Sequence, residues 1–464
     1  MSPHPTRILI TLCLASCVAA GALAQPGTLD LTFDPGTGLT GPGYGNDLHE
    51  MPDGRMIVVG AFAAYNGVPA NNIIRLMPDG SIDPTFNAGS GFDVQAFQIR
   101  LQPGGKLIVA GGFTTYNGQP APRIVRLGMD GQYDATFQAG VGLNSVLSSL
   151  VIDVEGRIYA GGNSITYDGS SGGDIIRILP DGALDPTWEI QGFDLPYYDM
   201  EICPDSNVVY AIGGDMGRLF QSGAPDATFD GDGAESTIRV LHPLPDCRMY
   251  VGGVFDYFEG EQVGRITRVN SDGTRDTTFN TGGGANFHVE EVAVMPDGKV
   301  VVAGGFNTFV GVTSWGLARM LPDGSFDAAF TVGIGQALFT TGTADKIKAL
   351  PDGKLMILGQ FDTFNNIPRS GICRLNGDDL NTGTPAFSAQ APLRYTMGAN
   401  GDVTLLDATG VMRHVRVLDM HGRLALDLRT NADVPTGRLA PGAYLLTALD
   451  PTTGMERRAV LVRH

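Results

Sequence analysis

The sequence predicts an all-β protein: a seven-bladed β-propeller of four-stranded blades, closed by its own N-terminal strand and followed by a small C-terminal β-sandwich. Three observations predict the propeller. A two-part motif recurs seven times, mostly about 51 residues apart; each copy has room for four short strands; and the two ends of the array carry complementary parts of one copy. Four strands per repeat at this period are typical of propeller blades, whose sheets bury both faces against their neighbours.

The composition fits this prediction and excludes one class of partner. The chain has 464 residues, with 65 Gly, 28 Pro, 43% apolar and only 17% charged residues. This is a turn-dense β composition without the low hydrophobicity of disorder. The net charge is −18. Because nucleic acid binding needs clustered Lys and Arg, we expect no nucleic acid partner, and the acidity suits the solubility of a secreted protein.

The outer half of each repeat is a short hairpin, seen most clearly in RLMPDGSIDPTF, residues 75–86. Pro78 presets φ and Gly80 can take a positive φ, so Arg75 faces Asp83 across the hairpin. Copies recur at residues 126–137, 177–188, 218–229, 268–279 and 319–330. Since the charges have the same placement in every copy, we interpret them as structural cross-strand pairs rather than catalytic groups. Besides the first, the full copies give the pairs Arg126 with Asp134, Arg177 with Asp185, Arg268 with Asp276 and Arg319 with Asp327.

The inner half of each repeat supplies the count. It is an alternating strand, a turn and an apolar strand, with the turns at positions 54, 105, 156, 206, 247, 298 and 353. The ends of the array then complete each other. The seventh repeat has Arg374 but no Asp eight residues later, whereas Asp30-Leu31-Thr32-Phe33 has no hairpin before it. A ring closes if this N-terminal strand becomes the outermost strand of the seventh blade, with Asp30 opposite Arg374.

These landmarks resemble those of the delta-60 repeat family. The shared patterns are Pro-Asp-Gly-Lys, Gly-Gly-x-Phe, Arg-Leu and Asp-x-x-Phe, and they cover about residues 28–379. The resemblance implies a propeller-like repeat domain of the kind found in large secreted or surface proteins. It implies no defined activity.

The N-terminus has the features of a bacterial export signal. Arg7 gives a positive start, residues 8–20 an apolar core, and Ala22-Leu23-Ala24 a small-residue cleavage site, so we expect residues 1–24 to be removed. As an alternative, Leu14-Ala15-Ser16-Cys17 resembles a lipobox, which would lipidate Cys17. No later apolar run is long enough for a membrane-spanning helix. The predicted propeller then covers residues 25–379 and a linker covers residues 380–392.

Residues 393–464 change in character to short alternating strands, which predict the β-sandwich. This segment resembles the type A sorting domain of the type IX secretion pathway. The residues that carry the resemblance are Asp419, Gly422, Arg423, Pro441, Gly442 and Tyr444. The resemblance implies recognition by the type IX machinery of a Gram-negative bacterium, and export through the periplasm to the outer surface or the medium. Release and surface anchoring both stay open.

We find no catalytic motif, so we expect no enzymatic activity and no cofactor. The propeller has three histidines at unrelated repeat positions, His49, His242 and His288, and no zinc-ligand spacing. Ca²⁺ bound by the acidic turn 230–235 is an alternative to an ordinary turn. Cys203 and Cys247 lie near equivalent points of adjacent repeats and either bridge two blades or stay separate thiols; Cys373 is expected in the core.

The loops predict where a ligand binds. The tight turns share one face of the ring, so the variable loops share the other, and they carry aromatic side chains that suit a glycan or a protein surface. The candidate ligand-binding residues are Tyr116, Tyr167, Tyr197, Tyr198, Tyr257 and Trp315. We therefore expect a monomeric, secreted or surface-displayed binding or adhesion module. The alternatives are an extracellular lyase or hydrolase at the channel mouth, for which the sequence shows no carboxylate pair that can be placed there, and a purely structural adhesin.

Overall fold

The computed structural model describes residues 25–171, 173–188, 197–203, 207–231, 233–330, 332 and 343–378, and beyond these mainly strands. The chain divides into two units, Met1–Leu380 and Asn381–His464. The predicted signal peptide, including Cys17, and the predicted linker lie outside the described residues.

In its described part, the first unit contains seven main three-stranded antiparallel sheets, each formed by one repeat, besides a short three-stranded sheet in the order β1 (Leu39–Thr40), β4 (Ala64–Tyr65), β5 (Val68–Pro69). In chain order they are β2 (Tyr44–Glu50), β3 (Met56–Ala61) and β6 (Ile73–Leu76); β7 (Ala96–Gln102), β8 (Lys106–Gly111) and β11 (Ile124–Gly128); β12 (Ser149–Ile152), β13 (Ile158–Gly161) and β16 (Ile175–Ile178); β17 (Tyr197–Ile202), β18 (Val208–Ile212) and β19 (Asp215–Leu219); β20 (Ile238–Pro243), β21 (Met249–Gly253) and β24 (Ile266–Val269); β25 (Val289–Val294), β26 (Val300–Gly304) and β29 (Leu317–Met320); and β30 (Ala344–Ala349), β31 (Leu355–Gly359) and β34 (Ile372–Leu375).

The expected fourth strand of each sheet is reduced to a single bridge, so the prediction of four-stranded blades was wrong in this detail. In the first sheet the bridge joins Leu76 to Ile82. Directly after it, the carboxylate of Asp83 accepts hydrogen bonds from the backbone and the hydroxyl of Thr85. This local turn competes with the extended conformation and ends the ladder.

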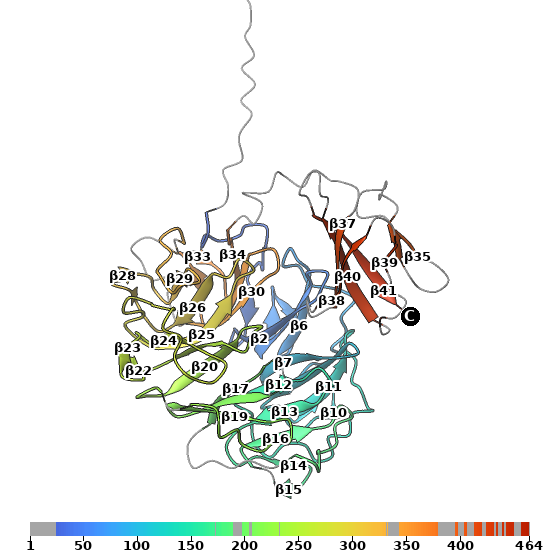
Figure 1. Ribbon diagram of the computed structural model, residues 1–464. Coiled ribbons are helices and arrows are strands. Elements are labelled where there is room, and N and C mark those ends of the chain that lie inside the picture. Colours follow the sequence, from blue (N-terminus) through green and yellow to red (C-terminus); the bar gives the residue numbers. More distant parts are fainter. Residues whose placement is uncertain are drawn as a thin grey trace, which may run out of the picture. The chain divides into compact units, whose positions relative to one another are not determined.

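Most middle loops fold into two-stranded hairpins. Figure 1 shows hairpins such as β14–β15 and β22–β23 at the periphery of the first unit and strands such as β2, β20 and β25 nearer its centre. The fourth sheet has no such hairpin among its described residues, because a tight turn joins β18 directly to β19. The short strands are β1 (Leu39–Thr40), β4 (Ala64–Tyr65), β5 (Val68–Pro69), β9 (Thr115–Tyr116), β10 (Gln119–Pro120), β14 (Thr166–Tyr167), β15 (Ser170–Ser171), β22 (Tyr257–Phe258), β23 (Glu261–Gln262), β27 (Thr308–Phe309), β28 (Val312–Thr313), β32 (Thr363–Phe364) and β33 (Ile367–Pro368).

The N-terminal segment lies against the last sheet. The backbone N–H of Asp30 donates to the carbonyl of Arg374 at 2.8 Å, and Leu29 forms a bridge with Leu375. The Arg374 Nε donates to the Asp30 carboxylate at 2.7 Å, and both residues are buried. The first strand of each sheet contacts the first strand of the next, and β30 of the last sheet contacts β2 of the first.

Each motif arginine also connects its own sheet to the following one. Arg75 donates through Nε to Asp83 at 2.7 Å and through Nη2 to Thr85 at 2.7 Å, and its guanidinium lies 5.0 Å from the ring centroid of Phe86. Its Nη1 donates to the carbonyl of Met129, in the turn of the second sheet. Arg374 makes the equivalent bond to the carbonyl of Pro78 at 2.6 Å, so the last sheet is joined to the first. Arg126, Arg177, Arg218 and Arg268 also donate to a turn carbonyl in the next sheet.

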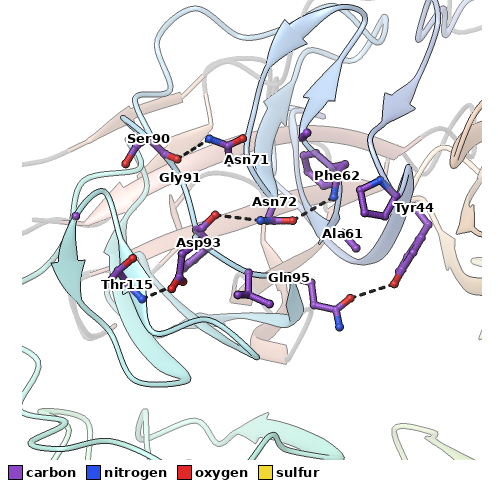
Figure 2. Close-up of a pocket in the computed structure, with 15 residues that line it drawn as sticks. Tyr44, Ala61, Phe62, Asn71, Asn72, Ser90, Gly91, Asp93, Gln95 and Thr115 are labelled. Carbon is purple, nitrogen blue, oxygen red and sulfur yellow. Dashed lines mark hydrogen bonds between the residues drawn. The ribbon is translucent and has the colours of Figure 1, made fainter.

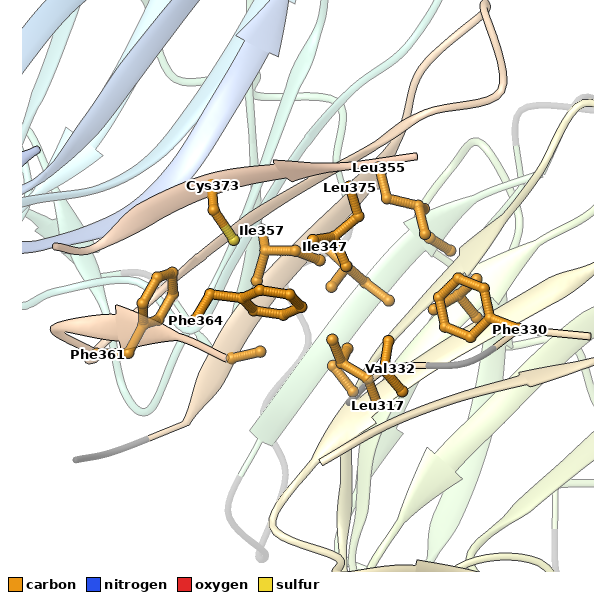
Figure 3. Packing of buried hydrophobic residues seen from close by; sticks show 14 of the residues in the cluster. Leu317, Phe330, Val332, Ile347, Leu355, Ile357, Phe361, Phe364, Cys373 and Leu375 are labelled. Carbon is orange, nitrogen blue, oxygen red and sulfur yellow. The ribbon is translucent and has the colours of Figure 1, made fainter. Parts of the chain in front are cut away.

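The hydrophobic core is a series of layers between neighbouring sheets. In Figure 3, Leu317 and Phe330 of the sixth repeat pack with Ile347, Leu355 and Ile357 of the seventh. Cys373 belongs to this layer and is fully buried, which raises the pKa of its thiol. Such layers bury both faces of a sheet, as the apolar strands of the sequence require. Cys203 and Cys247 pack in one layer between the fourth and fifth sheets.

The second unit contains two antiparallel sheets in its described part. One has β35 (Tyr395–Met397), β36 (Val403–Leu405) and β39 (Asp433–Val434); the other has β38 (Leu424–Thr430), β37 (Arg413–Asp419), β40 (Gly442–Leu449) and β41 (Glu456–Arg463). Asp419 is opposite Tyr444 in the register of β37 and β40. Gly422, Arg423 and Pro441 lie outside the described residues. Across the described parts of both units, no helix is long and apolar enough to cross a membrane.

Candidate functional site

Two of the predicted ligand-binding tyrosines are packed inside the protein, so their assignment to a binding surface was wrong. Tyr116 is 0% exposed and donates its hydroxyl to the carbonyl of Gly131, and Tyr167 is 1% exposed and donates to that of Gly182. The reason is that each middle hairpin folds back onto its own sheet. A ring with no exposed surface cannot stack on a ligand from solvent.

The other predicted aromatic residues have mixed surroundings. Tyr257 is 47% exposed at the start of β22. Trp315 is partly buried against the layer between the sixth and seventh sheets. The side chains of Tyr197 and Tyr198 lie outside the described residues.

A groove of about 680 Å³ lies between the first and second sheets (Figure 2). We call it the groove. Its apolar lining includes Phe62, Phe92 and Val94, and Val94 is 47% exposed. The hydroxyl of Tyr44 donates to the Oε1 of Gln95 at 3.1 Å, which connects the two sheets at one side of the groove. Its polar lining consists of Asn71, Asn72, Ser90, Asp93, Gln95 and Thr115.

The first two repeats differ at one position of the groove lining. The side chain of Asn72 donates to the carbonyl of Phe92 at 3.0 Å. In the next repeat Arg123 occupies the equivalent position and donates to the carbonyl of Leu143 at 3.0 Å. Asn72 and Arg123 also share a left-handed backbone, with φ of 64° and 66°. Asn72 therefore makes the same contact with a shorter side chain and leaves space that an arginine would fill.

The one carboxylate in the groove has a structural role. Asp93 accepts the backbone N–H groups of Thr114 and Thr115 at 2.9 and 3.0 Å. Glu235 accepts the N–H groups of Asp256 and Tyr257 in the same way in the fifth repeat, at 2.6 Å each. These contacts hold the middle hairpins. Glu235 belonged to the alternative Ca²⁺ turn; Asp232 lies outside the described residues, and no cluster of three or more metal-ligating side chains is found among those that are described.

A second cavity, of about 530 Å³, lies where the first strands of the seven sheets meet. We call it the central cavity. In six of the sheets a bulge near the start of the first strand shifts the register, as between Gly45 and Asp47. Bulges re-aim side chains, and here the residues after them line the cavity. Its charged lining includes Asp47, Arg100, Asp199, Glu201, Glu291 and Lys346.

Some of the charged groups in the central cavity form hydrogen bonds between neighbouring sheets. Asp47 accepts the N–H of Ile99 at 3.1 Å and pairs with Arg100, and Asp199 accepts the N–H of Leu241 at 2.9 Å. First strands have an unpaired edge toward the cavity, so these carboxylates satisfy backbone groups that would otherwise lack partners. Burial would raise the pKa of Asp47, but the charges of Arg100 and Lys346 outweigh it and hold that pKa below its ordinary value.

Glu201 differs from these groups. No hydrogen bond or ion pair joins its carboxylate to another residue that the structure describes, although it is only partly exposed. Burial, and then the nearby charge of Asp199, raise its pKa from 4.5 to about 8. Burial likewise raises the pKa of Asp199 and of Glu291, although Lys346 lies 2.6 Å from Glu291. Burial lowers the pKa of His49 and of His242 to about 4, so both are neutral at pH 7.

The sequence contained a signal for this cavity that we missed. Seven residues before each turn position lie Asp47, Gln98, Ser149, Asp199, Val240, Glu291 and Lys346. The rest of the repeat is regular, whereas this position varies and is mostly polar. Aligning the seven repeats on their turns would have placed the carboxylates of Asp199 and Glu201 beside one channel. Our statement that no carboxylate pair can be placed there was wrong.

The raised pKa of Glu201 predicts a stability that depends on pH. Between pH 4.5 and about 8 the folded protein holds a proton on Glu201 that the unfolded chain releases, so stability falls as the pH rises through this window. We expect Glu201→Gln to raise the free energy of unfolding at pH 9 by on the order of 1–3 kcal/mol, allowing for solvent in the cavity, and to change it little at pH 4. Urea unfolding at both pH values measures this. Equal effects at the two pH values would contradict it.

The comparisons with known proteins support the repeat architecture. Residues 52–86, 102–137, 156–187, 244–279, 296–330 and 350–379 match the family model described as a domain of unknown function (DUF5122) β-propeller. No curated protein matches the chain.

Several solved structures are distantly similar. PorZ, a surface component of the type IX secretion system of Porphyromonas gingivalis, is 16% identical with a TM-score of 0.40, over 95% of this chain and 60% of that one. The extracellular domain of a putative hybrid two-component system from B. thetaiotaomicron is 13% identical with a TM-score of 0.44, over 94% and 58%. A chain of a mitotic checkpoint complex is 14% identical with a TM-score of 0.48, over 80% and 98%.

The chain spans about 60% of the length of the first two of these structures, and no activity is carried over from any of them. The family match rests on segments that each contain a tight turn and an outer hairpin, which are the elements that build the seven sheets. The chain is therefore a repeat β-propeller protein in which six repeats match the DUF5122 model.

Proposed function

We propose that this protein is a secreted or surface-displayed binding module, a closed seven-bladed propeller whose ligand is held in the groove. The observation that carries the proposal is the groove itself, a cavity of about 680 Å³ on a rigid scaffold, lined by apolar side chains and a few polar groups. Binding sites for small ligands commonly have this construction. Part of the groove lining, such as Ser90, Val94 and Gln95, lies on the segment that links the first sheet to the second, and such connecting segments commonly carry binding residues.

A neutral glycan fits the lining better than an acidic ligand does. None of the described residues that line the groove is Lys or Arg, so a phosphate, sulfate or uronate would find no opposite charge. Asn71, Ser90 and Gln95 offer amide and hydroxyl groups, and Tyr44 and Val94 offer apolar surface beside them. A loop of a protein partner with exposed polar side chains is the second ligand class that this lining suits.

A groove-filling substitution tests this proposal. Asn72→Arg reproduces the side chain that Arg123 carries in the second repeat, on a backbone that already has the required φ, so the fold should survive. We expect this variant to lose at least tenfold in affinity for a glycan identified by array on the unmodified protein, because the guanidinium occupies the ligand's space. Tyr44→Ala should weaken the same glycan by roughly 1–3 kcal/mol, as aromatic anchors do.

Tyr257→Ala is the matched control, since it removes an exposed tyrosine from the fifth repeat. It should leave the affinity unchanged. If Tyr257→Ala abolishes binding and Asn72→Arg does not, the ligand site lies over the fifth repeat and the groove proposal is wrong.

We also propose that the second unit is a β-sandwich that directs export by the type IX pathway. The resemblance of residues 393–464 to a type A sorting domain supports this, together with the export signal read from residues 1–24. The two antiparallel sheets of the unit suit a sandwich. The protein would then be found on the outer surface of the cell or in the medium.

Glycan cleavage in the central cavity is the second candidate function. It is favoured by Glu201, whose raised pKa suits a general acid, beside the carboxylate of Asp199. Against it, Asp199 is already engaged by two backbone N–H groups, from Met200 and Leu241. Release of reducing ends from the glycan bound on the array, lost in Glu201→Gln, would establish cleavage; intact glycan after prolonged incubation would exclude it for that ligand.

A further inference from the structure

The central cavity has a charge composition that the binding proposal does not use. Six carboxyl groups line it, on Asp47, Asp199, Glu201, Glu290, Glu291 and Asp345, and so do four cations, on Arg100, Arg239, Lys346 and Lys348. Among the carboxyl groups, Asp47, Asp199, Glu201 and Glu291 are in electrostatic contact with one another. Arg100 pairs with Asp47, and Lys346 pairs with Glu291 at 2.6 Å. Arg239 pairs with Glu290, and Lys348 is exposed at the cavity. Among the described residues neither Asp199 nor Glu201 forms an ion pair, and the carboxyl groups of the lining outnumber its cations by two, six against four.

An uncompensated carboxylate next to a second one is unfavourable in a partly buried site. The cavity can reach neutrality in two ways: by holding protons on its carboxyl groups, or by admitting cations from solution. The raised pKa values of Asp199, Glu201 and Glu291 indicate the first way, in which the carboxyl groups hold protons. A cationic ligand supplies the second, and it would displace a proton as it binds.

The spacing of the carboxylates favours an organic cation over a metal ion. Among the described residues, no three metal-ligating side chains come close enough to hold one ion. The carboxylates are instead spread over four strands, β2, β17, β25 and β30, around a cavity of about 530 Å³, which has room for an extended aliphatic chain. The apolar part of such a chain also finds partners, since Leu48, Ile99 and Val292 contribute to the lining.

We propose that the central cavity binds a small aliphatic diamine or polyamine, with one ammonium group beside Glu201 and Asp199. This site is separate from the groove, and the proposal does not depend on the groove's function. Glu201 is the specificity-determining residue, because it is the carboxylate with no other hydrogen-bond or ion-pair partner in the described part of the chain. The charged and titratable groups that line the cavity with it come from six first strands: Asp47 and His49 on β2, Arg100 on β7, Asp199 on β17 itself, Arg239 and His242 on β20, Glu290 and Glu291 on β25, and Asp345, Lys346 and Lys348 on β30.

Binding should be coupled to proton release. With a pKa of about 8, Glu201 is ionised in about 3% of free molecules at pH 6.5 and in about 75% at pH 8.5. Titration calorimetry of the purified chain with spermidine should therefore show at least tenfold tighter binding at pH 8.5. At pH 6.5 the observed heat should vary with the ionisation enthalpy of the buffer, because up to one proton leaves the protein. Putrescine should bind with the same pH dependence.

Two variants assign the site. Glu201→Gln keeps the size of the side chain and should weaken spermidine at pH 8.5 at least tenfold. Glu155→Gln, which removes a carboxylate that is 61% exposed on a turn of the third repeat, should bind as the unmodified protein does. Mg²⁺ alone, at the same concentration as spermidine, should give no binding heat.

Three results would overturn the proposal: no heat of binding with spermidine or putrescine, equal affinity in Glu201→Gln and the unmodified protein, or binding with no proton release at pH 6.5. The last measurement uses the unmodified protein alone, so it tests the proposal even if a variant fails to fold. Loss of spermidine binding in Asn72→Arg would instead place the amine in the groove.

Discussion

Deletion of residues 25–33 is expected to destabilise the whole first unit, by at least about 3–5 kcal/mol. The deletion removes the carboxylate of Asp30, which pairs with the buried Arg374, and the fully buried ring of Phe33. It leaves a buried guanidinium without its partner and exposes an edge of the last sheet. Urea unfolding followed by tryptophan and tyrosine fluorescence measures the change.

Two single substitutions separate the effect of closing the ring from the effect of losing an ion pair. Asp30→Asn weakens the pair that joins residues at opposite ends of the array, and Asp83→Asn weakens the equivalent pair within one hairpin. In Asp83→Asn, the short turn of the hairpin still connects the segments that carry residues 75 and 83. In Asp30→Asn, no such turn connects the N-terminal segment to the strand that carries Arg374. We expect Asp30→Asn to lower the free energy of unfolding more than Asp83→Asn does, and to speed hydrogen exchange of the backbone N–H of residue 30. Equal costs, or a deletion variant within about 0.5 kcal/mol of the parent, would refute the role of this segment in closing the ring.

Removal of residues 393–464 is expected to stop the protein in the periplasm. The predicted signal peptide carries the chain across the inner membrane only, so without the proposed sorting domain nothing directs it onward. The first unit should still fold, because the described contacts divide it from the second unit. Cell fractionation and protease treatment of intact cells, in a host with the type IX pathway, measure the location. We expect no truncated protein outside the cell.

A shorter deletion provides the control for this experiment. Removing residues 381–392 alone, which are the predicted linker, should leave export unchanged. If the chain truncated at residue 392 reaches the surface or the medium at the level of the parent, export does not need the second unit and the sorting-domain proposal fails.

The sequence was most informative where one pattern recurs. The eight-residue spacing from Arg75 to Asp83 is repeated along the chain, so a single reading of turn chemistry predicted hairpins throughout the array, and the Arg374–Asp30 contact followed from their complementary ends. The length of the fourth strand was not predictable from the same pattern. Asp83 and Thr85 close a local turn that ends the ladder, and a Thr is equally suited to a strand or to such a turn.

The candidate site was less predictable because it depends on departures from the pattern. Tyr116 suggested an exposed aromatic loop, but its phenol group is bonded to the carbonyl of Gly131 within its own repeat. Whether a hairpin extends into solvent or folds back is decided by packing, which spacing alone does not show. The groove lining carries Asn72 where the next repeat carries Arg123, and the charge of the central cavity depends on a position that varies between Asp47, Glu291 and Lys346. Both are differences between aligned repeats.

The motif arginines have a consequence for how the first unit folds. Arg75 satisfies two of its donors within its own sheet but depends on the carbonyl of Met129, in the second sheet, for a third. In a single isolated repeat, one N–H donor of this guanidinium would therefore have no protein acceptor. In an open array such dependence would leave a terminal repeat unsupported, and unfolding would begin there. Here Arg374 donates to the carbonyl of Pro78, which joins the last repeat to the first, so we expect the first unit to unfold cooperatively rather than from one end of the array.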